Sequence, residues 1–271
     1  LLFILFKFIG YQNSSNIGAK IGKIFGPIFR SKNIIKKNLE YAGIKNETEQ
    51  KKVIEEMWEN YGRILAEYPF LKKFKTNELK KYITIEGQEY LSDIKSKNKK
   101  AVFVSGHFNN FELMAMQLEN LGIDLAAIYR PLNNFLMNKK MEKIRINHIC
   151  KKQIKKGKSG LRDVLKYLKQ GTSIALMIDQ RVSEGKKIKF FNKFALTTTI
   201  PAQIVAKYEC AVIPIYIERY NKYYFKMKIS KPLNLSKSDS LELISEKLNN
   251  LLEKMIMKNP SQWIWSHNRW K

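Results

Sequence analysis

Residues 101–112 read AVFVSGHFNNFE. The first five are small or apolar and include β-branched side chains, a composition typical of a strand buried on both faces. Gly106 ends this strand and permits a tight turn in which a substrate can approach the backbone closely. Asn109–Leu121 then has helical spacing, and Gly122 ends it. A buried strand followed directly by a helix is typical of an α/β fold.

The alternation of strands and helices continues along most of the chain and predicts a mostly parallel or mixed central sheet covered by helices on both faces. We expect two regions, an N-terminal helical region at residues 1–70 and one α/β domain at residues 71–271. Helical patterns occur at 47–68, 134–149, 160–169, 201–209 and 241–257, and strand patterns at 82–86, 125–129, 173–178, 211–217 and 223–229.

The N-terminus favours a membrane contact. The chain starts with Leu1, so we expect it to begin inside a longer gene product or after processing. Residues 1–9 are apolar apart from Lys7, but as a helix they span only about 13 Å of a hydrocarbon core about 30 Å thick. Residues 1–9 can therefore be the tail of a membrane anchor, an interfacial helix or a helix of the protein core. Apolar residues from Ile17 to Phe29 alternate with basic ones, which suits an anionic membrane surface.

The charge of the chain requires an acidic partner. The 271 residues include 50 Lys and Arg against 24 Asp and Glu, a formal net charge of +26. Nucleic acid, an anionic membrane, and an acidic protein or phosphorylated substrate are all open. The basic residues are mostly Lys, accompanied by much Ile and Asn, as an AT-rich genome imposes, so part of the charge has no functional meaning. No block of five or six like charges indicates a nucleic-acid-binding arm.

Composition also limits the chemistry. With 44% hydrophobic residues the chain can bury a core, and a mean hydropathy of −0.36 excludes a multi-span membrane protein. Cys150 and Cys210 form no disulfide framework or zinc motif. We therefore predict no metal and no cofactor. A metal hydrolase using His107, His148 and Asp179 is an alternative that the presence of only three His disfavours.

His107 lies in the predicted strand-to-helix turn, and Glu112 follows five residues later. Glu112 can fold back and hydrogen-bond one ring nitrogen, which leaves the other nitrogen as a general base. Each residue alone also has an ordinary structural explanation. His107 can be a capping or core histidine, and Glu112 can be a first-turn acid favoured by the helix dipole. The pair in this structural order favours a catalytic dyad. A second predicted strand ends in Asp179 and Gln180, where chemistry gathers in α/β sheets.

Residues 105–113, SGHFNNFEL, resemble the His-x4-(Asp/Glu) signature of the lipid A biosynthesis late acyltransferases of the lauroyl/myristoyl type. Asn109-Asn110-Phe111 departs from the family's more frequent Gly-Asn-Trp, Asn192 replaces a usual Gly, and most of the expected N-terminal membrane helix is missing. Other segments agree in order and spacing: Tyr129–Leu132, Arg145 in a helix, Asp179-Gln180, Phe190–Ala195, Thr197–Thr199 and Gln262–Lys271.

The resemblance implies transfer of a fatty acyl chain from acyl carrier protein to a hydroxyl of a lipid A precursor. It implies His107 as general base with Glu112 as its partner, and substrate contacts from Arg130, Arg145, Asp179 and Gln180. From the residues alone, Arg130 suits a phosphate or carboxylate but equally a structural salt bridge. Asp179 suits either a contact to Arg130 or Arg145 or, preferentially, a cap on the following loop. Arg145, Arg130 or backbone amides at the helix start are the candidate oxyanion donors.

The partners implied are acyl carrier protein, a phosphorylated glycolipid acceptor and a membrane surface, with no nucleic acid. The expected location is the cytoplasmic face of the inner membrane, held peripherally or by a single N-terminal anchor. Two alternatives stay open. The same dyad suits an acyltransferase that acts on a glycerol-phosphate, a lysophospholipid or another glycolipid. A non-enzymatic basic protein that binds membranes or nucleic acid, with an inert His107, is the second.

Overall fold

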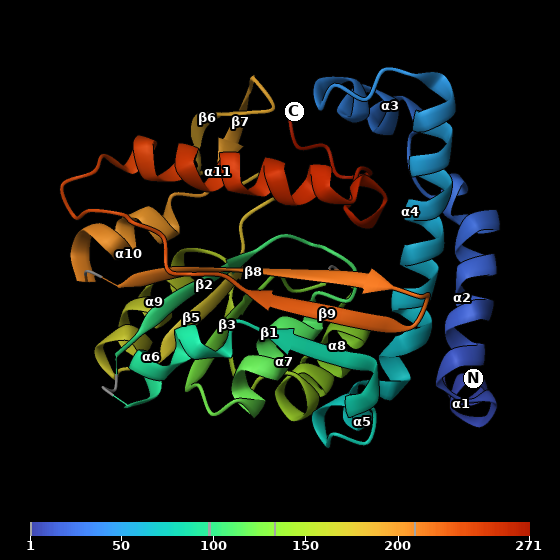
Figure 1. Ribbon diagram of the computed structural model, residues 1–271, viewed down its shortest axis with the longest axis horizontal. Coiled ribbons are helices and arrows are strands. Elements are labelled where there is room, and N and C mark those ends of the chain that lie inside the picture. Colours follow the sequence, from blue (N-terminus) through green and yellow to red (C-terminus); the bar gives the residue numbers. More distant parts are fainter. Residues whose placement is uncertain (1, 97–98, 133, 209) are drawn as a thin grey trace.

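The computed structural model of the protein describes residues 2–96, 99–132, 134–208 and 210–271. Its centre is a seven-stranded mixed sheet with the order β1-β9-β8-β2-β5-β3-β4, and a separate β6–β7 hairpin lies above it (Figure 1). The predicted α/β class and mixed sheet are therefore confirmed. The strands are β1 (Ile83–Glu86), β2 (Ala101–Ser105), β3 (Leu125–Tyr129), β4 (Lys152–Lys155), β5 (Ser173–Met177), β6 (Lys186–Phe190), β7 (Lys193–Thr197), β8 (Ala211–Tyr220) and β9 (Tyr224–Ile229).

Helices cover both faces of the sheet, with α10 and α11 on one side and α7 and α8 on the other (Figure 1). Within the described residues, none of the helices combines the length and the apolar composition needed to cross a membrane. The α-helices are α1 (Leu2–Ile9), α2 (Tyr11–Phe25), α3 (Lys32–Tyr41), α4 (Glu47–Glu67), α5 (Leu71–Lys75), α6 (Ser92–Ser96), α7 (Glu112–Asn120), α8 (Phe135–His148), α9 (Lys158–Lys169), α10 (Ile200–Tyr208) and α11 (Leu241–Lys258).

The two faces of the sheet bury separate apolar cores. Successive side chains of a strand point to opposite faces. In β2, Val102 and Val104 join the cluster beneath α9, α10 and α11, whereas Ala101 and Phe103 join the cluster that contains α7. All five residues of β2 are buried. The continuous apolar run 101–105 is therefore explained by a central strand with a core on each side.

The parallel register determines where the loops meet. β2 pairs with β5 in parallel, with Ser105 opposite Met177, and β5 pairs in parallel with β3. Their carboxyl ends consequently lie along one edge of the sheet. The loop after β2 contains His107, and the loop after β5 contains Asp179. Two segments that are 72 residues apart in the chain are thereby placed side by side.

The N-terminal helices are packed tightly onto the rest of the molecule. A Cβ atom on Gly62 of α4 would lie 1.9 Å from the carbonyl oxygen of Gly18 in α2, so these helices touch through their backbones. At the end of α4, the carboxylate of Glu67 is fully buried and pairs with Arg219 of β8 at 2.6 and 3.0 Å. The N-terminal region is thus coupled to the central sheet by both shape and charge.

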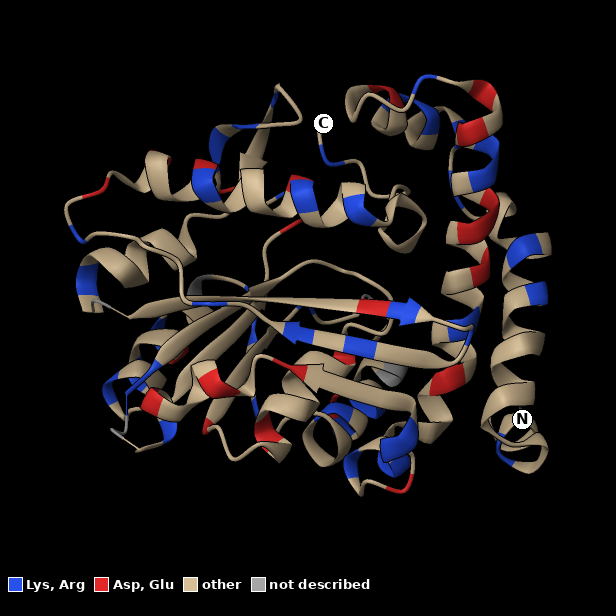
Figure 2. Ribbon diagram, in the orientation of Figure 1, with Lys and Arg blue, Asp and Glu red and all other residues tan. Residues whose placement is uncertain are grey.

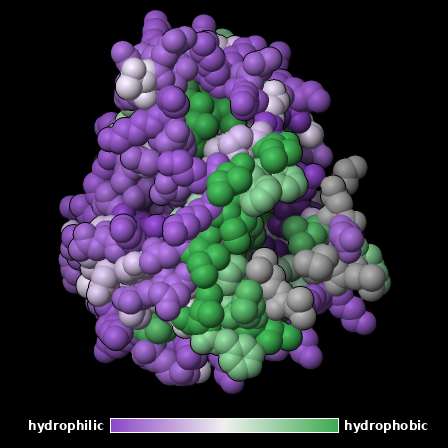
Figure 3. Space-filling model, turned by 90° about the vertical axis from the view of Figure 1, so that its right-hand side faces the viewer, coloured by the Kyte–Doolittle hydropathy of each residue, from purple (hydrophilic) through white to green (hydrophobic). Residues whose placement is uncertain are grey.

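The outer side of α1, α2 and the following 3₁₀ turn η1 (Gly26–Ile28) is apolar and exposed. Figure 3 shows this face as a continuous apolar band bordered by hydrophilic surface. Basic residues, by contrast, are spread over the helices and strands of every layer and form no single stripe (Figure 2). We define the apolar band by its exposed side chains: Ile4, Leu5, Phe8, Ile17, Ile21, Ile24, Phe25, Ile28 and Phe29.

Candidate active site

The loop between β2 and α7 holds His107 in a fixed, strained turn. Gly106 is required because a Cβ atom there would lie 2.8 Å from the ring of Phe108. Asn109 has φ 46°, and its side-chain amide donates to the carbonyl of Ile217 at 3.0 Å. Asn110 donates to the buried carboxylate of Glu67 at 3.2 Å. A left-handed residue held by buried hydrogen bonds is typical of a functional loop.

Asp179, at the end of β5, holds His107 with both carboxylate oxygens. Oδ1 lies 2.7 Å from the ring Nδ1, and Oδ2 accepts from the backbone N–H of His107 at 2.9 Å. The indole N–H of Trp263 also donates to Oδ2, at 2.8 Å. Burial alone would raise the pKa of Asp179, but the proximity of His107 and these hydrogen bonds lower it to about 2. The ionised carboxylate requires the proton on Nδ1 and leaves Nε2 as the basic nitrogen.

Glu112 does not contact the ring of His107, contrary to the expected dyad geometry. Its Oε1 instead accepts from the hydroxyl of Tyr68 at 2.6 Å and from Arg145 Nε and Nη2 at 3.2 and 3.0 Å. The fold explains the difference, because Glu112 begins α7 and faces α8, which contains Arg145. The ring of His107 contacts Asp179 on one side and Gln180 Nε2, at 3.4 Å from its Nε2, on the other.

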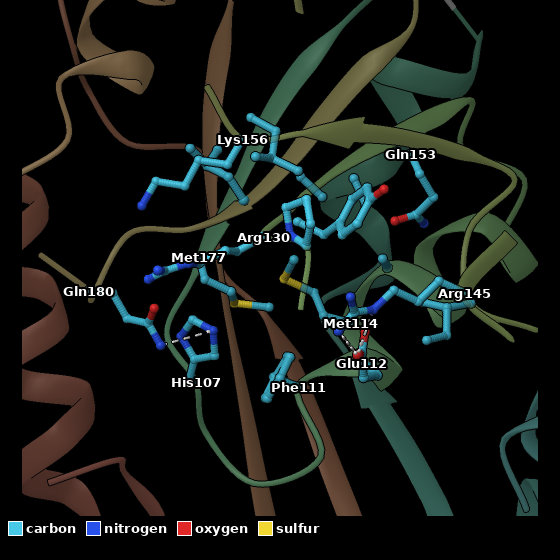
Figure 4. Close-up of a pocket in the computed structure, with 18 of the residues that line it drawn as sticks. His107, Phe111, Glu112, Met114, Arg130, Arg145, Gln153, Lys156, Met177 and Gln180 are labelled. Atoms are coloured by element: carbon cyan, nitrogen blue, oxygen red, sulfur yellow. Dashed lines mark hydrogen bonds and ion pairs between the residues drawn. The ribbon is translucent and has the colours of Figure 1, made fainter. Parts of the chain in front are cut away.

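A cavity of about 650 Å³ opens in front of the basic nitrogen of His107. This volume lies within the roughly 300–1,000 Å³ of small-molecule sites. Apolar side chains from α7, β3 and β5 line much of it, and Figure 4 shows Phe111, Met114 and Met177 directed into the space beside His107. The apolar part of the lining suits an alkyl chain.

Cationic side chains from several elements line the same cavity. They are Arg30 after η1, Arg130 after β3, Arg145 of α8 and Lys156 after β4. Burial and the nearby charge of Arg130 lower the pKa of Lys156. Burial alone would lower the pKa of Arg145, but Glu112 raises it, so its guanidinium stays charged. The cavity therefore presents positive charge to a ligand.

Asp179 differs from the role expected of it. Its carboxylate is fully buried and hydrogen-bonded to His107 and Trp263, so it does not pair with Arg130 or Arg145 and is not among the lining residues of the cavity. Gln180, Arg130 and Arg145 do line the cavity, together with His107 and Glu112. Five of the six predicted site residues thus line one cavity, Asp179 lies against His107, and the pairing among the six differs from the predicted one.

Two contributors from the C-terminal segment were not predicted. Trp263 braces Asp179, and His267 lines the cavity and accepts from the backbone N–H of Arg181 at 3.0 Å. Burial lowers the pKa of His267 to about 4, despite the opposing effect of Asp179, so this ring is neutral at pH 7. In the sequence, only the resemblance of residues 262–271 to the C-terminal segment of the family pointed to these two residues. That resemblance does not say which side chains they contact.

Among the described residues, no group of three or more His, Cys, Asp and Glu side chains is placed to hold a metal ion. His148, at the exposed end of α8, does not join His107 and Asp179. The metal-hydrolase alternative therefore has no geometric basis in this part of the chain. What remains is a histidine–carboxylate pair at the end of a cationic, partly apolar cavity, which defines a site for base-assisted transfer chemistry.

Comparison with known proteins agrees with this class of site. Residues 1–271 match the family model described as "Bacterial lipid A biosynthesis acyltransferase". The chain is 26% identical over 263 residues to the lipid A biosynthesis palmitoleoyltransferase of Escherichia coli K12, covering 94% of this chain and 84% of the relative. It is 24% identical over 271 residues to the lauroyltransferase of the same organism, with the same coverage, and 25% identical over 234 residues to a lipid A biosynthesis acyltransferase of Haemophilus influenzae, covering 83% and 72%.

The chain therefore belongs to the bacterial lipid A biosynthesis acyltransferase family. It is an O-acyltransferase, and its reaction is an acyl transfer in lipid A biosynthesis.

Proposed function

We propose that this enzyme transfers a fatty acyl chain from acyl carrier protein to a hydroxyl of a phosphorylated lipid A precursor, with His107 as general base. The observation that supports it best is the bond of 2.7 Å between His107 Nδ1 and the fully buried Asp179, at the end of a cavity suited to an alkyl chain. No resident cofactor takes part in this proposal.

In the proposed reaction, Nε2 of His107 removes the proton from the acceptor hydroxyl as its oxygen attacks the thioester carbonyl. The new C–O bond gives a tetrahedral intermediate with an oxyanion. When the intermediate collapses, the C–S bond breaks and the imidazolium returns the proton to the departing thiolate. Asp179 stabilises the imidazolium and fixes its tautomer in both steps, because the carboxylate accepts from Nδ1.

The oxyanion requires a donor close to the base. With the proton on Nδ1, Gln180 Nε2 donates to Nε2 of His107 at 3.4 Å, and in the proposal this amide turns to the substrate oxygen when the acceptor hydroxyl takes its place at Nε2. In Figure 4 Gln180 and His107 point toward one another at one end of the cavity. We assign the oxyanion contact to Gln180 in preference to Arg145, which is bound to Glu112.

Glu112 acts in this proposal by holding Arg145. One nitrogen of Arg145, Nη1, is buried in the cavity wall without a hydrogen-bond partner in the protein. An unpaired buried donor on a charged group is costly, and a substrate oxygen would satisfy it once the side chains that cover it move aside. Arg145 thus serves as a substrate contact, and Arg30, Arg130 and Lys156 are the proposed contacts for the phosphates of the acceptor.

The proposed location is the cytoplasmic face of the inner membrane. Nine exposed apolar side chains form the apolar band, with Lys7, Lys20 and Arg30 exposed on the same segments, whereas Lys23 is paired with Glu55 and Glu59. A basic amphipathic surface of this kind binds anionic bilayers. Acyl carrier protein, an acidic and soluble donor, would approach from the aqueous side, and a net charge of +26 favours its encounter.

The test is incubation of the purified enzyme with a series of acyl-carrier-protein thioesters and a tetra-acylated lipid A precursor, followed by mass spectrometry. We expect one acyl group to be added, and His107→Ala to lower the rate by about 10²–10⁴-fold without loss of folding. A folded His107→Ala variant that keeps the wild-type rate would contradict the assignment. Acylation of a lysophospholipid or another glycolipid in preference to the precursor would overturn the proposed acceptor.

A further inference from the structure

Two separate segments bring exposed apolar side chains and an arginine to the cavity. In the first, Ile28 and Phe29 are 74% and 76% exposed and directly precede Arg30, which lines the cavity. In the second, Arg130 and Leu132 line the cavity, and Phe135, at the start of α8, is 77% exposed. The first segment belongs to the apolar band. The second lies between β3 and α8, outside it.

We propose that Leu132 and Phe135 form a second bilayer contact that, together with the apolar band, places the opening of the cavity against an anionic membrane surface. The proposal rests on the proposed function, because it explains how a lipid acceptor reaches His107. It commits to one occupant, the headgroup and upper acyl region of an anionic bilayer.

Charge complementarity favours a bilayer over an apolar protein partner. Among the described residues, the charged side chains that line the cavity are Arg30, Arg130, Arg145 and Lys156 against one acid, Glu112, which is already paired with Arg145. Arg30 directly follows Phe29, and Arg130 lies two residues before Leu132. A peripheral membrane-binding surface is expected to combine apolar side chains, which insert into the bilayer, with neighbouring arginines, which bind lipid phosphates.

Geometry gives the second contact a function that the first lacks. A single apolar band along α1 and α2 fixes one line of the molecule to the bilayer but leaves rotation about that line free. A second contact on another element removes this rotation. The acceptor can then enter the cavity directly from the bilayer, without exposing its acyl chains to water.

The test measures partition of the full chain onto vesicles of phosphatidylcholine with phosphatidylglycerol, by flotation. Phe135→Asp should lower the partition coefficient by about tenfold, because a large apolar side chain is lost from the contact. Phe135→Leu should bind like the wild type. Leu243→Asp is the matched charge control, since Leu243 is as exposed as Leu132, at 42%, and sits at the start of α11, on the side of the molecule away from α2 (Figure 1).

Each outcome is decisive once circular dichroism shows that the variants are folded. A loss of partition in Phe135→Asp but not in Leu243→Asp supports the second contact. Equal partition of Phe135→Asp and wild type overturns it, and so does an equal loss in both charge variants. Acyl transfer to a detergent-dispersed acceptor is measured in parallel. If transfer is absent while partition depends on Phe135, the proposed function fails and the second contact stands.

Discussion

Asp179 contacts His107 twice, through the ring at 2.7 Å and through the backbone amide at 2.9 Å. Asp179→Asn keeps the shape of this side chain but removes the negative charge that stabilises the imidazolium. We expect kcat to fall by about 10²–10⁴-fold with little change in KM, as measured by steady-state transfer from an acyl-carrier-protein thioester.

The control for this variant is Trp263→Phe, which removes one donor to Asp179 and leaves the bond to His107 in place. This variant should lower kcat by less than about tenfold, since the carboxylate keeps its negative charge. Wild-type kcat in Asp179→Asn would show that Asp179 has only a structural role.

His267 makes the stability of the protein depend on pH. Burial lowers its folded pKa to about 4, from an ordinary value of 6.5. Below pH 6.5 the unfolded chain therefore binds a proton that the folded chain does not, and the free energy of unfolding decreases as the pH falls from 6.5 to about 4. His267→Gln, which keeps a polar group beside the N–H of Arg181, should flatten this slope.

Urea unfolding of both proteins across this pH range tests the prediction. The wild type should lose on the order of 2 kcal/mol more than the variant, after allowance for solvent screening of a partly exposed ring. Parallel pH profiles for the two proteins would contradict it.

At the scale of elements, a buried ion pair between α4 and β8 links the N-terminal region to the sheet. Glu67 is fully buried and accepts from Arg219, from Ser15 at 2.9 Å and from Asn110 at 3.2 Å. Glu67→Gln leaves Arg219 buried without its counter-charge. We expect a loss of about 3–5 kcal/mol in the free energy of unfolding, measured by denaturant titration.

A neighbouring pair supplies the matched control. Glu218, one position earlier in β8, pairs with Lys258, whose side chain is 53% exposed. Glu218→Gln should cost less than about 1 kcal/mol, because water already solvates that pair. Similar losses of unfolding free energy in both variants would show that the buried ion pair contributes no more to stability than the exposed one.

The sequence pattern predicted the buried central strands and the long helix α4 closely. β2 and β3 have the predicted bounds, 101–105 and 125–129, and α4 differs from its prediction by one residue. β4 was missed because it lies at the edge of the sheet and begins and ends in Lys. The β6–β7 hairpin was missed because Phe191 and Asn192, with φ of 49° and 58°, form its turn without the Asn-Gly signal of such turns.

At the scale of the whole molecule, strand order decides the site, and strand order is not encoded locally. The sequence predicts a hydrogen bond between His107 and Glu112, because the two residues are only five positions apart in the chain. The structure pairs His107 with Asp179, because β5 is inserted between β2 and β3 in the sheet. Residue types and strand ends were therefore sufficient to find side chains that meet at one edge of the sheet. Their pairing requires the order of the strands, which depends on how the whole chain packs.

The net charge of +26 leads to a last prediction at this scale. Basic residues are spread over every layer of the fold (Figure 2), so the protein has a broad positive potential that would attract the proposed acidic donor, acyl carrier protein, before any close contact forms. Raising the ionic strength from about 0.05 to 0.5 M shortens the range of this attraction to a few Å. We expect KM for an acyl-carrier-protein thioester to rise by at least about tenfold, with kcat nearly unchanged, because screening acts on encounter.

An acyl thioester of pantetheine, which is small and uncharged, is the matched control, and its KM should not rise with salt. Equal salt dependence for both donors would show that the charge acts within the site or on the membrane rather than on the carrier protein.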